Sequence, residues 1–530
     1  MAKERWGSKL GVILAVAGSA VGLGNFLRFP GQVAQYGGGA FIIPYLVALF
    51  LLGVPLMWVE WTIGRFGGGF GHSTAPGAFH TMWNKNRFIK YFGVIGIFGP
   101  AVIYIYYVYI ESWLLGYSVF ALGGAYKDCQ TKEAIAGFLG EYTGAKRGSH
   151  FSNLLPAYGF FLATFAANIG ILLYGIRGGI ERVCKIALPL LVVLAVVLVV
   201  RVFTLGTPNP QHPENNVING LGYLWNPKWE YLAKPDVWLA AAGQIFFTLS
   251  VGIGAILTYA SYLKKNDDVA LSGLTASAAN EFAEVILGGS IVIPAAFTFF
   301  GMTATQDFAK GGTFQLGFLA MPMVLEQMPG GNVLGFMWFL LLFLAGITSS
   351  ISLAQPAVAF LEDEFNLTKR KAVILFGVVT FIICHVCILG GDGVIDEMDF
   401  WGGKLGLVVF ALVEAVLFAW VFGMDRAWTE LHTGSDIRIP TIYRFILKYV
   451  TPLLLIAILV SWCITDLYKT LTLEGVDRAE VPWRVLTRVI LILVFALLCF
   501  LVWAVWRRRR LENGGPAVTD QPAVTSEDKP

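Results

Sequence analysis

Two short glycine-rich segments interrupt hydrophobic stretches of this chain. The first stretch contains Val21-Gly22-Leu23-Gly24, and the sixth contains Val251-Gly252-Ile253-Gly254. A glycine costs a helix about 1 kcal/mol relative to alanine, so close glycines favour an unwound backbone. For the first stretch alone, close packing of helices through small residues is the alternative. Unwound carbonyl oxygens coordinate hard cations such as sodium, and the amides at a helix N-terminus hold a carboxylate. The repetition of the break favours this chemistry over packing.

Several side chains that carry oxygen accompany the two breaks. Any one of them alone can be a hydrogen bond between helices. Their clustering beside the glycine segments predicts instead that they complete the coordination shell of a cation. These side chains are Asn25, Thr248, Asn280, Thr348 and Ser349.

Ionisable residues inside hydrophobic stretches are costly and indicate function. Arg28 follows the first glycine segment, and Asp399 begins the tenth stretch, so the two could pair on the outer side. Glu284 is one helical turn from Asn280 and therefore on the same helix face. The other carboxylates are candidates for function or for holding neighbouring helices together: Glu60, Glu111, Glu281 and Glu414.

The composition is that of a membrane protein. The chain has 530 residues, of which 56% are hydrophobic and only 14% are charged, and its mean hydropathy is +0.67. Soluble domains carry roughly 25% charged residues. A net charge of +3 gives no argument for nucleic acid binding. The first stretch exceeds signal-peptide length and lacks a small-residue cleavage pattern, so we expect it to be retained.

About twelve stretches are long enough to cross a hydrocarbon core of about 30 Å. They lie near residues 10–33, 39–66, 89–122, 157–176, 180–204, 236–262, 270–301, 331–361, 370–390, 395–422, 443–466 and 483–506. Lysine and arginine are concentrated on alternate loops, which predicts that both termini are cytoplasmic. In such a chain, a matched pair of helix breaks indicates the central binding site of a transporter.

No motif indicates catalysis. The sequence contains no phosphate-binding Gly-Lys-Thr loop, no His-Glu-x-x-His helix and no nucleophile elbow. We therefore expect neither an enzyme nor an ATP-driven pump.

Motifs in a fixed order along the chain resemble one family. They are Gly22–Pro30, Gly37–Phe41, Tyr106–Trp113, Gln244–Ser250, Asn280-Glu281 with Glu284, Ala345–Ser350, Phe360–Glu364 and Asp396–Trp401. On these motifs the chain closely resembles the neurotransmitter:sodium symporters, and most closely their prokaryotic leucine-transporter (LeuT) branch. The resemblance implies an all-α integral membrane protein with a LeuT-type five-plus-five inverted repeat, two further helices, and unwound first and sixth helices.

The implied repeat divides the chain into six parts. These are a cytoplasmic N-terminal segment (1–9), a first repeat with helices 1–5 (10–204), an extracellular loop (205–235), a second repeat with helices 6–10 (236–422), helices 11 and 12 (423–506), and a disordered cytoplasmic tail (507–530).

The resemblance also implies uptake of an amino acid by alternating access, coupled to two sodium ions. The first ion would bind the substrate carboxylate, the Ala20 carbonyl, Asn25, Thr248 and Asn280. The second would bind the carbonyls of Gly18, Val21 and Ala345 and the hydroxyls of Thr348 and Ser349. A negative substrate oxygen offsets the charge of an ion in a low dielectric, so that each stabilises the other.

The implied substrate pocket draws on four of the helices. Its residues are Ala20, Gly22, Leu23, Gly24, Ile103, Tyr107, Phe247, Thr248, Ser250, Ile253, Ser349 and Leu353. In the family, Tyr107 would hold the carboxylate and Phe247 would close over the substrate. Ile253 enlarges the pocket relative to the leucine-transporter branch and Ile103 narrows it, so the size of the side chain it accepts stays open.

Two gates are implied as well. Arg28 and Asp399 resemble the outer gate. Asp363, together with Ser261 and Tyr262, resembles the inner gate of the family. The basic partner of Asp363 is either Arg5 or Lys3.

Two positions bear on the cargo and on the ions. Gly22 stands where members that carry monoamines have an aspartate, which favours an amino acid over a dopamine-like substrate, and we expect that amino acid to be neutral and hydrophobic. Tyr45, Gln244 and Asn280 match the chloride site of the family. Glu284 stands where chloride-dependent members have a small neutral residue, so it is a chloride-site substitute and we expect chloride independence. Whether Glu284 also couples a proton stays open.

The alternatives to symport are an ion channel and an amino-acid-binding sensor built on a transporter scaffold. An ion channel would need a ring of filter residues around an open path, and an amino-acid-binding sensor would need a signalling partner. We expect a multi-pass protein of the cell membrane whose partners are an amino acid, sodium ions and the lipid bilayer, without nucleic acid. The sequence leaves the oligomeric state undetermined.

Overall fold

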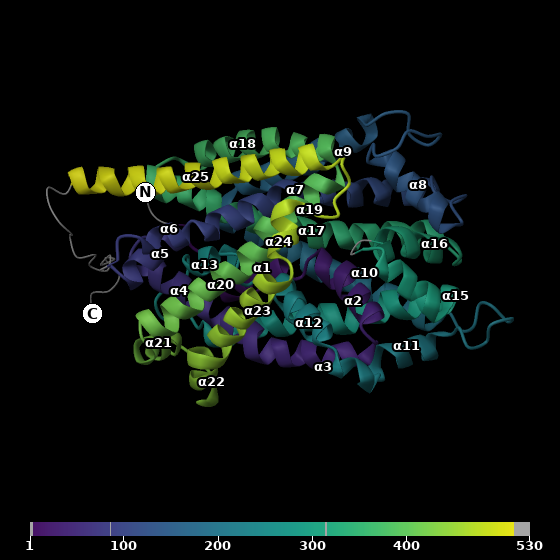
Figure 1. Ribbon diagram of the computed structural model, residues 1–530, viewed down its shortest axis with the longest axis horizontal. Helices are drawn as coiled ribbons and strands as arrows, with labels where there is room; N and C mark the ends of the chain where they lie inside the picture. Colours follow the sequence, from purple (N-terminus) through teal and green to yellow (C-terminus); the bar gives the residue numbers. More distant parts are fainter. Residues whose placement is uncertain (1–3, 85, 313–314, 513–530) are drawn as a thin grey trace.

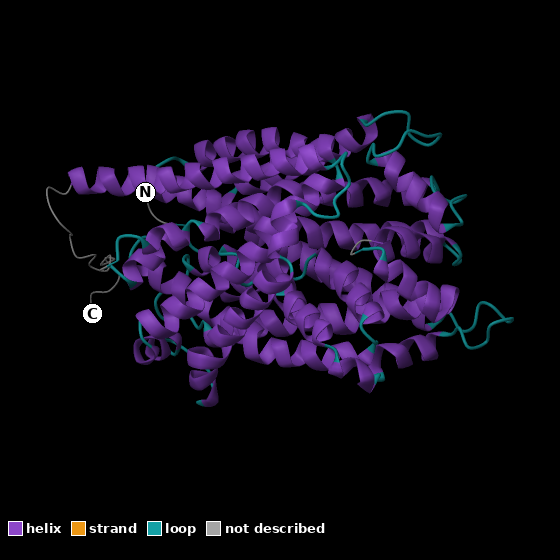
Figure 2. Cartoon of the chain, viewed as in Figure 1, coloured by secondary structure: helices purple, strands orange, loops and turns teal. Residues whose placement is uncertain are grey.

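The protein is a bundle of long helices. The structure, a computed structural model, describes residues 4–84, 86–312 and 315–512, with side chains up to residue 509. In this part of the chain every regular element is helical, apart from one isolated β-bridge between Gly38 and Pro227. Figure 2 shows the helices joined by loops, with no sheet.

Ten continuous helical segments are long and apolar enough to cross a membrane. They are α3–α4 (Gly39–Gly69), α6–α7 (Ile89–Gly123), α9 (Leu155–Leu173), α10 with the turn before it (Ile176–Phe203), α14–α15 (Ala270–Lys310), α17 (Gly331–Phe365), α18 (Lys369–Gly390), α19–α20 with the turn after it (Asp392–Val421), α22–α23 (Ile442–Thr465) and α25 (Val481–Glu512).

One bent pair of helices in the described chain passes the same test together and gives an eleventh crossing, and a second broken pair lies where the sixth of the twelve expected crossings is predicted. The first crossing consists of α1 (Lys9–Ala20) and the helix Gly24–Gln35, which contains α2 (Phe29–Gln35), and the two parts are bent by 45°. The sixth consists of α12 (Pro235–Thr248) and α13 (Ala255–Ala260). Both breaks occur at the glycine segments predicted from the sequence.

The backbone of the sixth crossing leaves the helix in residues 249–254. Ser250, Gly252 and Gly254 all have positive φ, of 54°, 74° and 89°. Such values are easy for glycine and uncommon for serine. The Ser250 hydroxyl donates to the Ser19 carbonyl at 2.8 Å and so links the two breaks.

A buried carboxylate supports the same break. Glu60, on α4 (Val54–Gly69), is fully buried and accepts a hydrogen bond from the Gly252 amide. A buried amide without a partner costs about 1–3 kcal/mol, so Glu60 removes a penalty that the unwound backbone would otherwise carry.

Glycines on α4 allow α13 to lie directly against it. A Cβ atom added at Gly64 would overlap the Leu257 carbonyl, and one added at Gly68 would overlap the Ser261 carbonyl. The backbones of α4 and α13 are therefore in contact, without side chains between them.

The short helices gather at the two ends of the bundle. Figure 1 shows α5 (Ala75–Met82) and α21 (Met424–Leu431) at one end, and α8 (Lys132–Tyr142), α11 (Val217–Trp225) and α16 (Met321–Glu326) at the other. In the interior, α7 (Ile95–Gly123) packs along α17. The helices α9, α23 and α25 expose many apolar side chains, as lipid-facing helices do.

The last helix extends beyond its expected end. We predicted the twelfth crossing over 483–506 and a disordered tail from 507, whereas α25 continues to Glu512. Its final turns are tied to the bundle, because Arg509 forms an ion pair of 2.8 Å with the buried Glu364 at the end of α17. The rest of the predicted tail, 513–530, lies outside the described residues.

Candidate functional site

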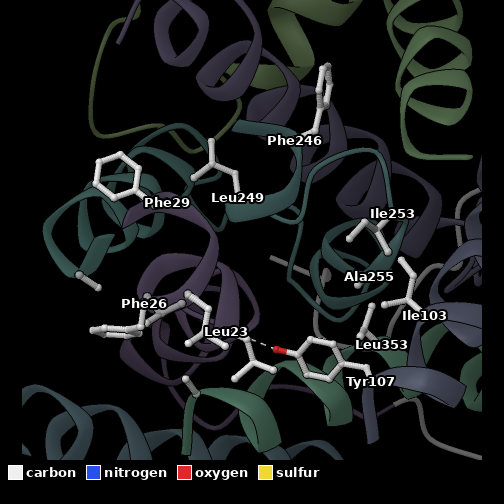
Figure 3. Close-up of a cluster of buried hydrophobic side chains, with 14 of the residues drawn as sticks. Leu23, Phe26, Phe29, Ile103, Tyr107, Phe246, Leu249, Ile253, Ala255 and Leu353 are labelled. Atoms are coloured by element: carbon white, nitrogen blue, oxygen red, sulfur yellow. Dashed lines mark hydrogen bonds between the residues drawn. The ribbon is translucent and has the colours of Figure 1, made fainter. Parts of the chain in front are cut away.

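A cavity lies where the two broken crossings meet α7, α17 and α20 (Gly406–Val416). All of the residues predicted for the substrate pocket line it, and Ser19, Asn25 and Leu407 line it as well. Figure 3 shows Leu23, Ile103, Tyr107, Ile253 and Leu353 around this region, with the Tyr107 hydroxyl directed at Leu23. The residues that the resemblance implies for the pocket, from helices 1, 3, 6 and 8, thus lie together around one cavity, and Leu407 of the tenth was not among them.

The cavity has a polar end and an apolar wall. At the polar end the Leu23 amide donates to the Tyr107 hydroxyl at 3.3 Å, next to the start of the helix Gly24–Gln35. The apolar wall consists of Ile103, Phe247, Ile253, Leu353 and Leu407. A helix N-terminus and a hydroxyl suit an anionic group, and the wall suits a hydrophobic one, so the cavity fits a small amphipathic molecule.

Oxygen atoms converge beside the polar end. Oδ1 of the buried Asn280 lies 3.1 Å from the Ala20 carbonyl and 3.2 Å from the Thr248 carbonyl, and it accepts from Asn25 Nδ2 at 2.8 Å. Acceptor oxygens this close repel one another unless a cation lies among them. Turning the Asn280 amide end for end is the alternative, because its nitrogen would then face both carbonyls. The arrangement therefore suits either a donor or a cation.

The amide of Asn25 takes part in this cluster through its nitrogen. Its Nδ2 also donates to Thr248 Oγ1 at 3.2 Å, while its Oδ1 accepts from the Gly22 amide at 2.8 Å. As a cation ligand, Asn25 would have to turn its oxygen towards the cluster and give up the bond from Gly22.

Glu284 adds a negative charge to the cluster. It is fully buried and accepts hydrogen bonds from the Thr248 hydroxyl and the Gln244 amide, with Asn25 Nδ2 at 3.3 Å and Asn280 Nδ2 at 3.4 Å. Among the described residues it forms no ion pair with a basic side chain. An unpaired buried carboxylate attracts a cation or a proton, so the electrostatics of the cluster favour a bound cation. Tyr45, the other residue of the chloride-site match, is buried on α3 (Gly39–Ala48).

A second group of oxygens joins the end of α1 to α17. Ser349 Oγ lies 3.3 Å from the carbonyls of both Gly18 and Ser19, and 3.0 Å from the Ala345 carbonyl. Thr348 Oγ1 donates to the Ala345 carbonyl at 3.1 Å. Gly18 keeps the helices close, since an added Cβ would lie 3.2 Å from Thr348 Cβ. Val21, the remaining predicted ligand, is the C-cap residue that directly follows α1.

The two residues predicted for the outer gate, Arg28 and Asp399, are not in direct contact. Among the described residues Arg28 and Asp399 form no ion pair, and the Arg28 guanidinium lies 4.8 Å from the centre of the Phe247 ring. Asp399 instead accepts from the Tyr106 hydroxyl at 2.7 Å and pairs with Lys404 at 3.0 Å. Lys404 was missed in the sequence, although a basic residue within a hydrophobic stretch is a signal that could have found it.

Residues of the predicted inner gate lie around the start of the chain and the end of α13. Asp363 accepts from the Ser73 amide at 3.0 Å. The Tyr262 hydroxyl accepts from Gln355 at 3.0 Å, and Tyr262 lines a second pocket together with Arg5. Ser261 is buried and donates to the carbonyl of Thr258 in its own helix. Lys3, the other candidate partner of Asp363, lies outside the described residues.

Comparisons with known proteins agree with this geometry. The model of the sodium:neurotransmitter symporter family matches residues 3–206 and 158–511. An uncharacterized sodium-dependent transporter of Methanocaldococcus jannaschii is 31% identical over 464 residues, which are 86% of this chain and 90% of that protein. A sodium-dependent nutrient amino acid transporter 1 of Drosophila erecta is 24% identical over 97% of this chain and 85% of its own length.

A solved structure shares the fold. MhsT in complex with L-phenylalanine matches with a TM-score of 0.74 and 29% identity, over 87% of this chain and all of that chain. The match confirms the predicted all-α architecture of the LeuT type.

Packing around Gly22 gives a prediction that does not depend on any ligand. A Cβ added there would lie 2.9 Å from Ser349 Oγ and 3.2 Å from the Tyr107 hydroxyl. Forcing a methyl group into a packed site costs about 1–3 kcal/mol. We expect Gly22→Ala to lower the thermal unfolding midpoint of the purified protein in detergent, followed by tryptophan fluorescence.

The matched control is Gly31→Ala in the same crossing. No atom lies within 4 Å of a Cβ added at Gly31, and its backbone is helical. This change should leave the midpoint unchanged or raise it, because alanine favours the helix. Equal midpoints for the two variants would show that the space at Gly22 is not restricted.

Proposed function

Because this chain belongs to the sodium:neurotransmitter symporter family, we propose that it takes up a neutral, hydrophobic amino acid together with sodium by alternating access. Membership confirms the resemblance drawn from the motifs, and it makes the chain a multi-pass secondary transporter and not an enzyme. We propose the substrate, a neutral and hydrophobic amino acid, the sodium ions that accompany it, and uptake as the direction of transport.

The observation that carries the proposal is the cavity between the two broken crossings. Its polar end offers the Leu23 amide and the Tyr107 hydroxyl for a carboxylate, and its apolar wall offers space for an uncharged side chain. At Gly22 no side chain is present that could meet the amine of a substrate without a carboxylate. Support also comes from relatives, since one is named as an amino acid transporter and MhsT was solved with L-phenylalanine.

Two sodium ions are proposed as co-transported cargo. The first would lie among Ala20, Thr248, Asn280 and Asn25, where the substrate carboxylate would complete its shell. The second would lie between the end of α1 and Ser349 on α17. Because the first ion and the substrate would share an oxygen in a low dielectric, binding of one strengthens binding of the other.

The proposed location is the cell membrane, with both termini in the cytoplasm. Segments that carry lysine and arginine, with Arg87 and Lys90 after α5 and with Arg426 and Arg438 in and after α21, adjoin the two short helices that Figure 1 shows at one end of the bundle. The positive-inside rule assigns that end to the cytoplasm.

Uptake into proteoliposomes tests the function. A panel of radiolabelled amino acids is offered with an inward sodium gradient, and in parallel with the sodium replaced by potassium. We expect sodium-dependent accumulation of apolar amino acids, with little of the charged ones and none of dopamine or serotonin. Accumulation that is the same in both salts would refute the coupling.

The second sodium site is tested by Thr348→Ala. Removal of the hydroxyl should raise the sodium concentration for half-maximal uptake at least threefold. The matched control is Thr380→Ala on α18, because Thr380 is also buried and also donates to a carbonyl of its own helix, at 2.8 Å. If both variants need the same sodium concentration as the unchanged protein, the site is placed wrongly.

Chloride independence follows from Glu284, whose fixed charge takes the place of an anion. Uptake should be unchanged when chloride is replaced by gluconate. Glu284→Ser removes the charge, and this variant should become dependent on chloride. Glu281→Ser, which alters the neighbouring carboxylate on α14 (Ala270–Glu281), should stay independent. A loss of uptake by the unchanged protein in gluconate would contradict the proposal.

A further inference from the structure

Asp399 of the proposed outer gate has both of its carboxylate oxygens engaged. Oδ1 accepts from the Tyr106 hydroxyl at 2.7 Å, and Oδ2 faces Lys404 Nζ at 3.0 Å. Arg28, the residue expected to pair with it, lies against Phe247 instead. A carboxylate offers about four acceptor sites, so Arg28 can approach Asp399 without displacing Tyr106, but its guanidinium would then compete with the Lys404 ammonium for the same negative charge.

The local helix geometry explains why Lys404 is within reach. Asp399 and Lys404 are five residues apart, and at 3.6 residues per turn such side chains would be roughly 140° apart around a helix. Residues Asp399–Leu405 form a π-helical turn instead. Its wider i→i+5 spacing brings residues five apart to the same side.

Gly403 leaves the space in which this arrangement forms. A Cβ added there would lie 2.8 Å from Asp399 Oδ1 and 3.2 Å from the Tyr106 hydroxyl. The π-helical turn thus places the Lys404 ammonium against the Asp399 carboxylate, and Gly403 leaves room for this contact.

Of the two partners of Asp399, Lys404 is the one that can leave at small cost. The Lys404 side chain is 54% exposed, so water can take over its ammonium group. Tyr106 is buried on α7, where its hydroxyl would lose its acceptor.

We propose that Lys404 is a second cation of the outer gate, which holds Asp399 while the gate is open and is exchanged for Arg28 when the gate closes. Lys404 would act by positioning Asp399 and would not touch the substrate. The exchange keeps the carboxylate paired in both states, so that closing costs little electrostatic energy. This role rests on the proposed transport function, since it needs a substrate that the gate retains.

The test measures how fast a bound amino acid leaves. Purified protein in detergent is loaded with tritiated L-phenylalanine in sodium, or with the best substrate of the uptake panel, and dissociation is followed after dilution into unlabelled ligand. Lys404→Gln removes the competitor of Arg28, so dissociation should slow at least threefold. Lys404→Arg, which keeps a cation, should behave as the unchanged protein.

Arg28→Gln separates this role from a merely local ion pair. If Lys404 competes with Arg28, Lys404→Gln should change the dissociation rate by less than 1.5-fold in the Arg28→Gln background. An equal change in both backgrounds would show that Lys404 acts independently of Arg28 and would overturn the proposal.

A lysine away from the cavity serves as the matched control. Lys310 is 64% exposed and pairs with Asp307 at 3.3 Å, and Lys310→Gln should leave dissociation unchanged. If the unchanged protein binds the amino acid in sodium but Lys404→Gln releases it at the same rate, only the role of Lys404 is refuted. If the unchanged protein shows no sodium-dependent binding, the proposed function is refuted and the gate with it.

Discussion

Peptide groups that leave a helix inside a membrane must find other partners, because no water is present to bind them. In the two breaks of this chain, side chains provide such partners for three of the peptide amides. The Gly22 amide donates to Asn25 and the Leu23 amide to Tyr107, while the Gly252 amide donates to Glu60. The carbonyl groups remain as acceptors, and hydroxyls and amides from other helices surround them. A cation and a carboxylate are ligands of the kind that such a set of groups requires.

The same requirement explains why polar side chains sit so deep in the bundle. Asn25, Asn280 and Glu284 are all fully buried, as are other polar side chains such as Glu60 and Gln244. Each of them is bonded to at least one other member of the cluster or to unwound backbone. A buried network that is fully bonded specifies one arrangement, whereas a partly bonded one is costly. A change at one member of this network therefore affects the others.

Much of this could be predicted from the sequence, because breaks and polar residues are rare in membrane helices and are visible against an apolar background. The crossings and both unwound segments were predicted in this way, whereas the lining of the cavity from four helices was implied by the resemblance to the family. Leu407 could not be found, since one more leucine in an apolar helix carries no signal. The pairing of Asp399 with Lys404 was missed because a regular helix separates these side chains, and π-helical turns are not visible in the pattern. The last turns of α25 extend beyond the predicted crossing, and a contact that the pattern does not show, the ion pair of Arg509 with Glu364, holds them in the bundle.

The direct contact between α13 and α4 restricts how the sixth crossing can move. With the Leu257 and Ser261 carbonyls resting on Gly64 and Gly68, no side chain between the two helices can rearrange to let one slide past the other. Glu60 of α4 also accepts from the Gly252 amide, so the unwound residues 249–254 are tied to α4 as well, and a displacement of α13 involves α4. Residues 54–65 of α4 are buried as α13 is, so the packed interior of the bundle has to accommodate any displacement of the two helices.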